Sequence, residues 1–598
     1  MLIWGWALVA LFLVLDALRV RGRVAAVTAL APSEDPVSPE HRFLVAPGVT
    51  LDDATKRAAS AHARANKLGV LDLFPSDMRT LPAWGLFQFL DPEKYRTDTL
   101  GKGISAGHAT LVTADVLRRA GVTTTEFTEE VAFVRAVGRL KWYASSGTDV
   151  AFADGLRAVP SRRKLAVLRE RHGSGADFVL GGVPIILAIV LIAAITGKAP
   201  GAAVAVAFTL QPFVAFAGGR LQTPDLLITS LLRWPLDLVS WFSLINEDAP
   251  AVDPREVDVR RPDYDRLLKD GLTPFFEPRR ETCPLCESRS LGRQLETPDL
   301  LQGKPGRFTM DRCGECGHIF QNPRLSLKGL EFYYKDFYDG LGGDEIEAIF
   351  GASLMQYHLR SEMVESEASP ARWLDVGGGH GHFCRIAKDR IPECRFEALD
   401  LSDSIEDAER RGWVDKGYKG LFPDMADGLK DQYDVVSMSH YLEHTREPEA
   451  EIEAAAKVVH AGGHLMIELP DPDCGLKSLF GKLWLPFFQP QHQHLLSTKN
   501  LEKLLVKHGF SVVKWHRGEA HQRIDFFAAV FLFVHWIAPK ADVPWRPRST
   551  WERRRRTLAF AAMLPFLMLA PLFDHGLAGL LARPGWSNTY RMLAQKKA

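Results

Sequence analysis

The sequence has no excess of charge of either sign. Its 73 Lys and Arg residues balance 73 Asp and Glu residues, so the formal net charge at pH 7 is zero. Proteins that bind nucleic acid through its phosphates carry a basic surplus or a basic patch. We therefore predict no nucleic-acid partner. The length of 598 residues predicts two or three domains, and the oligomeric state does not follow from the sequence.

The first apolar segment lacks a cleavage site of the Ala-x-Ala type. Leu2 to Leu18 is apolar except for Asp16, and arginines follow at positions 19, 21 and 23. A signal peptide would end in small residues at a cleavage site, whereas a retained anchor needs none. We interpret residues 1–23 as an N-terminal transmembrane anchor.

Two long stretches contain no charged residue at all. Phe178 to Thr196 is uncharged over 19 positions, and Gly201 to Gly219 is uncharged as well. Stretches of this length can cross a bilayer. Leu226 to Ile245 is also apolar, but it contains central charges, which are costly in lipid, and two tryptophans, which suit an interface. We predict a transmembrane hairpin and an interfacial helix within residues 177–250.

Basic residues set the predicted orientation. They cluster between positions 162 and 171, whereas the turn after Thr196 contains only Lys198. The positive-inside rule places residues 19–176 in the cytoplasm, and the hairpin returns the chain to the same side. We predict a multi-pass protein of the inner cell membrane, in contact with membrane lipids, whose soluble domains face the cytoplasm.

The C-terminal part is apolar again. Ile524 to Pro539 and Leu558 to Leu581 are separated by the basic run Arg553 to Arg556. One interpretation is that these stretches are buried helices of the preceding domain. We expect membrane-associated helices within residues 524–598, interfacial or re-entrant, because both stretches lack a regular polar face.

Residues 24–176 have the pattern of a mixed α/β region. Strands are expected at His41 to Leu44 and Leu71 to Phe74, and a helix at Leu51 to Leu68. Gly107 to Val112 leads into another helix, which ends near residue 120. This order, followed by a membrane hairpin, resembles the back half of family 2 glycosyltransferases.

The same region departs from that family at its metal site. Val45-Ala46-Pro47 stands where the family carries Asp-x-Asp, and Glu129-Glu130 stands where it carries its acceptor-side acids. Two carboxylates are needed to hold the divalent ion that binds a sugar nucleotide. The resemblance therefore implies a degenerate, non-catalytic module, retained for docking or for binding a lipid-linked acceptor. An unrelated cytoplasmic domain is the alternative.

Four of the seven cysteines form two Cys-x-x-Cys pairs, separated by 26 residues. Four thiolates at this spacing favour a tetrahedral, structural Zn²⁺ site, and glycines at 314 and 317 permit the tight turn. Disulfides and a redox pair are the alternatives, although the predicted cytoplasmic location disfavours disulfides. We expect His318 to be a neighbour and not a ligand. The predicted zinc ribbon spans residues 275–325, with ligands Cys283, Cys286, Cys313 and Cys316.

Residues 373 to 381 read Trp-Leu-Asp-Val-Gly-Gly-Gly-His-Gly, an apolar strand that runs into a glycine-rich turn before a helix. Glycines remove side chains where a nucleotide must approach the backbone. A second strand ends in Asp400, 19 residues after Gly381, where a carboxylate can accept hydrogen bonds from ribose hydroxyls. The predicted cofactor-binding residues are Asp375, Gly377, Gly379, Gly381 and Asp400.

The order of motifs after this turn resembles class I S-adenosylmethionine-dependent methyltransferases. Asp375 to Gly381 matches their acidic-x-Gly-x-Gly-x-Gly motif, and Asp400 matches their ribose acid. Leu442-Glu443-His444 matches the motif after their fourth strand. The resemblance implies S-adenosyl-L-methionine as cofactor and a doubly wound, Rossmann-like α/β sheet over residues 326–523. The expected fold is this sheet behind a small zinc ribbon, plus an N-terminal membrane-anchored α/β region with transmembrane helices.

A zinc ribbon directly before such a domain is similar to the sugar C-methyltransferases that act on nucleotide-linked deoxysugars. In that family the ribbon is a lid on the acceptor side. The aromatic stretch Phe332 to Tyr338 and the segment Gln491 to His494 fit the likeness. The resemblance implies an acceptor pocket that includes Tyr334, His492 and His494.

His444 is the predicted general base, because it follows the fourth strand at the end where ligands bind in open α/β sheets and imidazole titrates near neutral pH. Glu443 is expected to orient it or to contact the acceptor, and Tyr441 and His440 are second candidates for a catalytic role. Packing beneath the cofactor is the alternative role for His444.

Three functions are open at this point. The first is a membrane-bound methyltransferase for a sugar of a nucleotide- or lipid-linked glycan. The second is an O-methyltransferase for a lipid or quinone headgroup. The third is a non-catalytic membrane scaffold, which the intact carboxylates at 375 and 400 disfavour.

Overall fold

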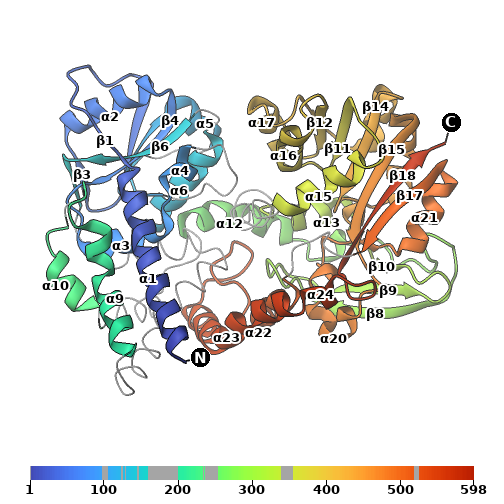
Figure 1. Cartoon of the computed structure of the whole chain (residues 1–598). Helices are drawn as coiled ribbons and strands as arrows, with labels where there is room; N and C mark the ends of the chain where they lie inside the picture. The colour runs from blue at the N-terminus through green and yellow to red at the C-terminus, as the bar shows by residue number, and fades with distance from the viewer. Residues whose placement is uncertain are drawn as a thin grey trace. The chain divides into compact units, whose positions relative to one another are not determined.

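The computed structural model divides the chain into two compact units, residues 1–253 and 254–598, which are described separately (Figure 1). The first is described over residues 2–96, over 105–158 without 121, 123, 124, 128, 129, 145 and 146, and over 200–235 without 222 and 234. The second is described over residues 254–337, 354–517 and 524–597.

Unit 1 contains a five-stranded mixed sheet in the order β1-β6-β4-β5-β2. Its central strand β4, Leu68–Pro75, is buried at every position because helices cover the sheet. The strands and helices expected between residues 41 and 120 are present. They are β1 (Thr28–Ala29), β2 (His41–Val45), β5 (Ala109–Thr113) and β6 (Gly147–Ala153), a small pair β3 (Val49–Leu51) and β7 (Leu156–Ala158), and helices α2 (Asp53–Ala65), α3 (Thr80–Phe89), α4 (Pro92–Arg96), α5 (Ala114–Arg119) and α6 (Glu130–Tyr143).

Unit 1 also contains an apolar helix pair. Helix α1 spans Leu2–Ala25, close to the predicted anchor, and packs on α9, Pro200–Phe216. A short helix α10, Leu226–Leu231, follows. Arg233 is buried against α9, where it donates to Phe208 O (2.9 Å) and Gln211 Oε1 (2.8 Å). The predicted span at 178–196 and residues 236–245 of the predicted interfacial helix lie outside the described residues.

Within the described residues, a single helix is long and apolar enough to cross a bilayer by length and composition. This helix is α23, Thr550–Gly576. Val204–Phe216 and Asp525–Ile537 are shorter apolar helices. The several transmembrane helices predicted for residues 1–250 therefore stay a prediction.

Unit 2 begins with α12 (Pro254–Leu268) and a small antiparallel sheet in the order β16-β10-β9-β8. Three of its strands lie in the predicted ribbon: β8 (Leu291–Thr297), β9 (Phe308–Cys313) and β10 (Ile319–Gln321). The fourth, β16 (His494–Leu495), comes from far along the chain and pairs with β10. The ribbon is thus joined to the larger domain by strand pairing. Helix α13 (Leu327–Tyr334) follows it.

The larger domain of unit 2 is a seven-stranded sheet in the order β13-β12-β11-β14-β15-β18-β17. The central strands are apolar and buried, as expected for parallel strands covered on both faces. The doubly wound α/β sheet is confirmed. Its strands are β11 (Arg372–Val376), β12 (Arg395–Asp400), β13 (Lys416–Lys419), β14 (Tyr433–Ser439), β15 (Val459–Pro470), β17 (Phe510–Arg517) and β18 (Thr589–Lys596), and its main helices are α15 (Leu354–Glu365), α16 (His382–Arg390), α17 (Ser404–Arg410), α19 (Pro448–Val458) and α21 (Thr498–Lys507).

The predicted domain boundary at residue 523 is wrong. Strand β18 pairs antiparallel with both β15 and β17, so the end of the chain lies inside the sheet (Figure 1). Residues 524–588 are therefore an insertion between two neighbouring strands, with helices α22 (Asp525–Ile537), α23 and α24 (Ala578–Leu581). A strand of eight residues behind a long apolar stretch was not recognised, because its pairing partners lie over 70 residues earlier in the sequence.

Candidate functional site

The glycine-rich turn follows β11 at the carboxyl edge of the parallel strands. Gly377, Gly379 and Gly381 have φ angles of 75°, 53° and 77°, a left-handed conformation that favours glycine. A Cβ at Gly377 would lie 2.6 Å from the ring of Tyr441. Gly381 is the residue before α16, so the turn leads directly into the N-terminus of that helix. This is the backbone arrangement of a nucleotide-binding turn.

Asp400, at the end of β12, holds the turn in place. Its Oδ2 accepts from the Gly379 N–H at 2.9 Å, and its Oδ1 accepts from the N–H and the hydroxyl of Ser402, both at 2.9 Å. The carboxylate is only partly buried. Since a carboxylate has about four acceptor positions, Asp400 can take a further hydrogen bond from a ribose hydroxyl.

Asp375 is buried beneath the turn. Its Oδ1 accepts from Ser437 Oγ at 2.5 Å, and that hydroxyl accepts from Trp373 Nε1 at 2.8 Å. Burial raises the pKa of Asp375 to about 6, against the hydrogen bond from Ser437 and the charge of Arg360, which lower it. The structure therefore places Asp375 as a support of the turn, with its side chain bonded inside the fold.

Three predicted site residues, Tyr334, His444 and His492, lie close together in the structure. His444 lies at the end of a 3-10 turn, Leu442–His444, and its Nδ1 is 3.0 Å from the hydroxyl of Tyr334. Its ring centroid is 4.6 Å from that of His492. We call Tyr334, His444 and His492 the histidine cluster. Burial lowers the pKa of His444, which Glu443 raises in part, so the imidazole is neutral at pH 7 and can accept a proton.

Glu443 bonds to His440, and its predicted roles, orienting His444 or contacting the acceptor, stay predictions. Its Oε1 lies 3.0 Å from His440 Nδ1, and His440 Nε2 lies 3.2 Å from Glu468. Burial opposes the charged form of His440, yet the two carboxylates raise its pKa to about 9.

Glu468 is a residue that the sequence analysis did not single out. It lies near the end of β15 in a fully buried position, between Arg360 (2.6 Å) and Arg591 (2.5 Å). Despite burial, these guanidinium groups hold the pKa of Glu468 well below its usual value. Arg591 belongs to β18, so this ion-pair network depends on the strand that the sequence analysis missed.

Two other predicted residues lie elsewhere. Tyr441 donates its hydroxyl to Glu451 at 3.0 Å and packs against the glycine turn, outside the histidine cluster. His494 is also outside it: its ring stacks on His318, with the Nδ1 and Nε2 atoms 3.1 Å apart. Burial lowers the pKa of His494 to about 4. His494 therefore joins the ribbon to the domain and lies outside the histidine cluster, and its predicted place in an acceptor pocket stays a prediction.

The four cysteines of the ribbon meet at one point. The Sγ atoms of Cys283 and Cys316 are 3.6 Å apart, and those of Cys286 and Cys313 are 3.5 Å apart. A disulfide requires about 2.05 Å, whereas four thiolates at about 2.3 Å from Zn²⁺ would be about 3.8 Å apart. The four thiols could hold a tetrahedral zinc ion, and His318 is not among the grouped ligands.

A second group of metal-ligand types overlaps the histidine cluster. Glu443, His444 and His492 each offer an atom, and these atoms lie within 4.8 Å of one another. Two imidazoles and a carboxylate could hold a divalent ion. An ion on His444 would prevent that side chain from acting as a base.

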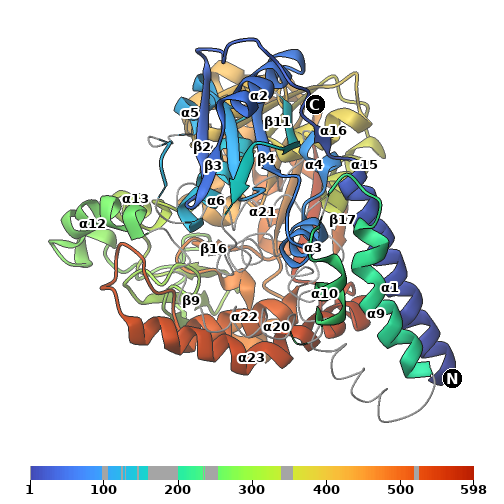
Figure 2. The ribbon, with the colours of Figure 1, turned by 90° about the vertical axis from the view of Figure 1, so that its left-hand side faces the viewer.

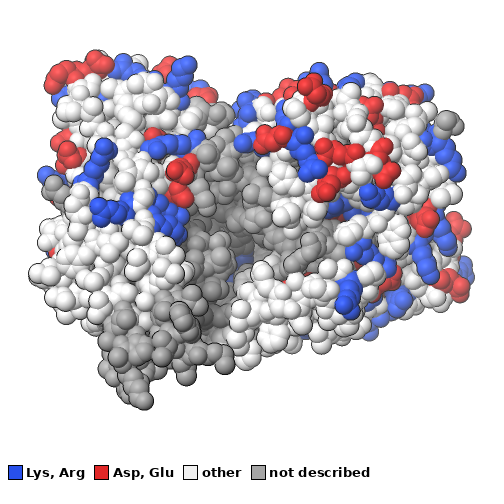
Figure 3. All heavy atoms as spheres, in the orientation of Figure 1, with Lys and Arg blue, Asp and Glu red and all other residues white. Residues whose placement is uncertain are grey.

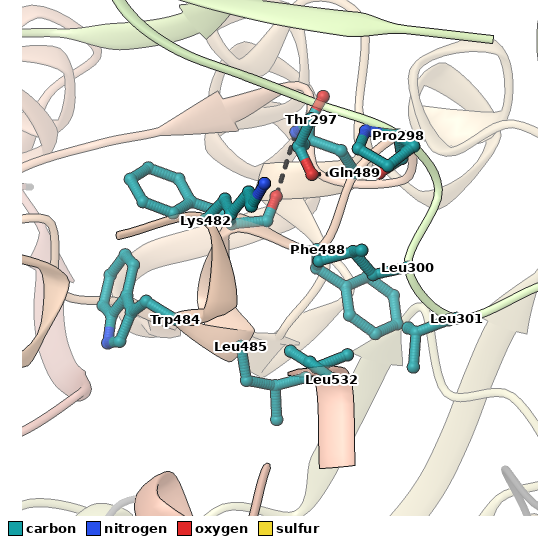
Figure 4. A pocket seen from close by; sticks show the side chains of 11 residues that line it. Thr297, Pro298, Leu300, Leu301, Lys482, Trp484, Leu485, Phe488, Gln489 and Leu532 are labelled. Atoms are coloured by element: carbon teal, nitrogen blue, oxygen red, sulfur yellow. Dashed lines mark hydrogen bonds between the residues drawn. The ribbon is translucent and has the colours of Figure 1, made fainter. Parts of the chain in front are cut away.

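A small pocket lined mostly by apolar side chains is present in unit 2 (Figure 4). It encloses about 280 Å³, including open space at its mouth, and Phe488 forms one wall. The ring of Phe488 is 4.9 Å from that of His492 and 6.4 Å from that of His444. The walls are formed by residues 297–301 after β8, by residues 482–489 and by Leu532 of α22. The apolar lining residues include Pro298, Leu300, Leu301, Trp484, Leu485 and Leu532.

Comparison with protein families identifies the larger domain of unit 2. Residues 352–514 match the model of a family described as a methyltransferase domain. The match covers the glycine turn, Asp400 and the 3-10 turn that carries His444. The chain therefore contains a methyltransferase domain. A comparison with curated protein sequences finds no match.

Several solved structures are similar to this chain over part of its length. An O-methyltransferase family protein from Burkholderia thailandensis is 22% identical, with a TM-score of 0.27, over 31% of this chain and 58% of that protein. A methyltransferase from Archaeoglobus fulgidus is 17% identical, with a TM-score of 0.27, over 44% of this chain and 99% of that protein. Human N-acetylserotonin methyltransferase is 12% identical, with a TM-score of 0.27, over 45% and 59%. At these scores no argument rests on the likeness.

Proposed function

We propose that this protein methylates a sugar of a nucleotide- or lipid-linked glycan intermediate at the inner face of a membrane. The observation that carries the proposal is the histidine cluster, which stands at the same strand edge as the glycine turn. It contains a neutral imidazole bonded to a tyrosine hydroxyl, next to an apolar pocket. This is the set of groups that an acceptor with an ionisable O–H or C–H needs.

Separate residues would bind the cofactor and act on the acceptor. The turn from Gly377 to Gly381 and the carboxylate of Asp400 would hold S-adenosylmethionine, which supplies an activated methyl group when bound. His444 would take the acceptor proton as the bond from the acceptor to the methyl carbon forms and the bond from that carbon to the donor sulfur breaks. Tyr334 fixes the His444 ring through the hydrogen bond of 3.0 Å. Accurate placement of this kind accounts for much of the rate in a displacement reaction.

We further propose that the ribbon holds a structural Zn²⁺ ion. Tyr334 lies at the end of α13, directly after the ribbon, and β10 of the ribbon pairs with β16 two residues after His492. Folding of the ribbon around the metal would thus place two members of the histidine cluster. Without the metal, the cofactor turn would stay intact, whereas Tyr334 and His492 would no longer be held in the histidine cluster.

The test has two parts that use the full chain. Binding of S-adenosylhomocysteine, measured by calorimetry, separates an enzyme from a scaffold, and absence of binding would refute the enzymatic role. Mass spectrometry of envelope lipids and glycans, from cells with and without this chain, would then find the acceptor as a species that loses one methyl group. An unchanged spectrum from cells that make active protein would contradict an envelope acceptor.

A further inference from the structure

The insertion between β17 and β18 exposes a long apolar stripe. Large side chains of α23 recur at the spacing of one helix face, each about half exposed or more. Soluble monomers rarely expose a continuous apolar surface of this length, and such surfaces mark sites of interaction. The residues of the stripe are Leu558, Phe566, Leu569, Leu572 and Phe573.

Helix α23 is held against unit 2 along its opposite face. Near its start, Arg556 donates to Ala538 O at 2.8 Å and lies 3.0 Å from His535 Nε2. Near its end, the buried carboxylate of Asp574 accepts from the N–H groups of Phe526 (2.9 Å) and Phe527 (3.1 Å). These contacts fix α23 antiparallel to α22 at both ends.

Both flanks of α23 return to the same folded unit. The preceding loop places Trp545 against Tyr264 of α12, with ring centroids 5.1 Å apart. The following residues enter β18 in the middle of the sheet. A spanning helix has its ends on opposite sides of a hydrocarbon layer about 30 Å thick. Helix α23 would have to abandon its polar contacts with α22 to span, although its length and composition permit it.

The charge of the insertion matches an anionic surface. Residues 524–588 contain eight Lys and Arg residues and four Asp and Glu residues. Of the arginines before the stripe, Arg553 pairs with Asp542 and Arg556 bonds to α22, whereas Arg554 is exposed. Exposed tryptophans at 536, 551 and 586 flank the stripe. Basic and aromatic residues beside an apolar helix face are typical of helices that lie in the plane of a membrane surface. Figure 2 shows α23 extended beside α22 and α20, and the surface over α22 to α24 is largely uncharged in Figure 3.

We propose that residues 524–588 dock the methyltransferase onto an anionic bilayer surface, with the stripe of α23 in the lipid, and that the acceptor is an amphiphile embedded in that bilayer. The second part rests on the proposed function. Leu532 of α22 lines the apolar pocket, whose opposite wall, Phe488, contacts the histidine cluster. An aliphatic segment of the acceptor enters this pocket, and the polar headgroup lies beside Tyr334 and His444.

The pocket is too narrow for a whole ligand. An aliphatic segment of the acceptor would enter only as the side chains of Leu532 and Phe488 move apart, and the rest of the acceptor would stay in the bilayer, where the stripe of α23 has placed the domain.

Photo-crosslinking to vesicles tests the proposal with the full chain. The vesicles contain phosphatidylglycerol and phosphatidylcholine, with a diazirine lipid whose reactive group is near the headgroup or at the acyl end. We expect the headgroup probe to label peptides across 558–580, and the acyl-end probe to label the pocket peptides 297–301 and 485–489. Labelling of all three segments should fall in vesicles of phosphatidylcholine alone.

Matched variants assign the labelling to the stripe and to the pocket. The triple variant Phe566→Glu, Leu569→Glu, Phe573→Glu should lower labelling of 558–580 by about tenfold, because buried charge is costly in lipid. Val506→Glu, at an equally exposed position of α21 (52% exposed), is the control and should change nothing. Leu532→Trp should remove only the labelling of the pocket peptides.

Four results would overturn the proposal. The first is that residues 558–580 are labelled no more strongly than α21, and the second is that labelling is equally strong in vesicles of phosphatidylcholine alone. The third is that the acyl-end probe labels the whole of α23, as it would a spanning helix. The fourth is that a second copy of the chain protects the stripe in the absence of lipid. Affinity for S-adenosylhomocysteine, measured in every variant, is independent of docking. Loss of that affinity in the wild type would refute the proposed function and leave the docking surface standing.

Discussion

Each unit of this protein contains a carboxylate in its central sheet, and the two carboxylates have opposite surroundings. Asp72, in β4 of unit 1, is fully buried and accepts from Tyr95 Oη (2.7 Å), from the Ala106 N–H (3.1 Å) and from Thr110 Oγ1. Burial raises its pKa, against the nearby charge of Lys141. Asp400 of unit 2 stands at the end of its strand beside left-handed glycines, and is only partly buried.

The difference shows how a carboxylate that stabilises the fold can be distinguished from one that can bind a ligand. The acceptor positions of Asp72 are used by partners of its own fold, in the middle of a strand and away from solvent. Asp400 has three such partners and remains accessible at the edge where loops can admit a ligand. Position along the strand decides the role, whereas residue type and hydrogen bonding alone do not.

Replacing Asp72 with alanine gives the largest expected effect on stability. Three buried donors would lose their acceptor, at about 1–3 kcal/mol each, so unit 1 should lose about 3 kcal/mol or more. Hydrogen exchange in β4 and β5 of the full chain measures this loss. Affinity for S-adenosylhomocysteine should not change. A loss of that affinity in the Asp72 variant would contradict the assignment of a purely structural role to Asp72.

His444→Gln should lower methyl transfer by about 10²–10⁴-fold, the usual contribution of a general base. Cofactor affinity should stay the same, because His444 is bonded to Tyr334 and not to the glycine turn. His460→Gln is the matched control, since His460 is 40% exposed and pairs with Asp434. Because burial lowers the pKa of His444, turnover should already be on its plateau at neutral pH and fall only in acid. Unchanged turnover would reduce His444 to a packing residue.

Asp400→Ala should weaken S-adenosylhomocysteine binding by about a hundredfold, from the loss of charge-assisted hydrogen bonds and of the Gly379 contact. Asp403→Ala serves as control, because Asp403 lies on the same loop and its side chain is 83% exposed. Calorimetry on both variants gives the comparison directly. Wild-type affinity in Asp400→Ala would show that the ribose site is elsewhere.

The ion-pair network around His440 predicts a smaller effect that depends on pH. The folded-state pKa of His440 is about 9, above the value near 6.5 expected in the unfolded chain. Its stabilisation is therefore complete below pH 6.5 and is lost as the pH rises through 9, by no more than about 3 kcal/mol. Urea unfolding between pH 6 and 10 measures this slope. His440→Gln should flatten it, and an equal slope in the variant would assign the effect to another group.

The local patterns around the cofactor turn were sufficient for prediction. The glycines at 377, 379 and 381 and the turn at 442–444 depend mostly on neighbours within a few residues, and Asp400 reaches Gly379 because β11 and β12 pair side by side. Other surroundings depend on distant partners. The ion-pair network around His440 includes Arg591 of β18, and His494 stacks on His318, which is 176 positions away.

The sequence by itself determined the methyltransferase domain, its cofactor turn and the four-cysteine group, because each is encoded by a short run of residues with one geometric solution. Only the tertiary structure decided that the last strand enters the sheet between β15 and β17, and that the apolar helices before it form an insertion. Strand pairing is a contact between segments far apart in the chain, and its energy comes from partners that no local pattern identifies. The same reason explains why the histidine cluster, drawn from positions 334, 444 and 492, could be proposed residue by residue but assembled only by the fold.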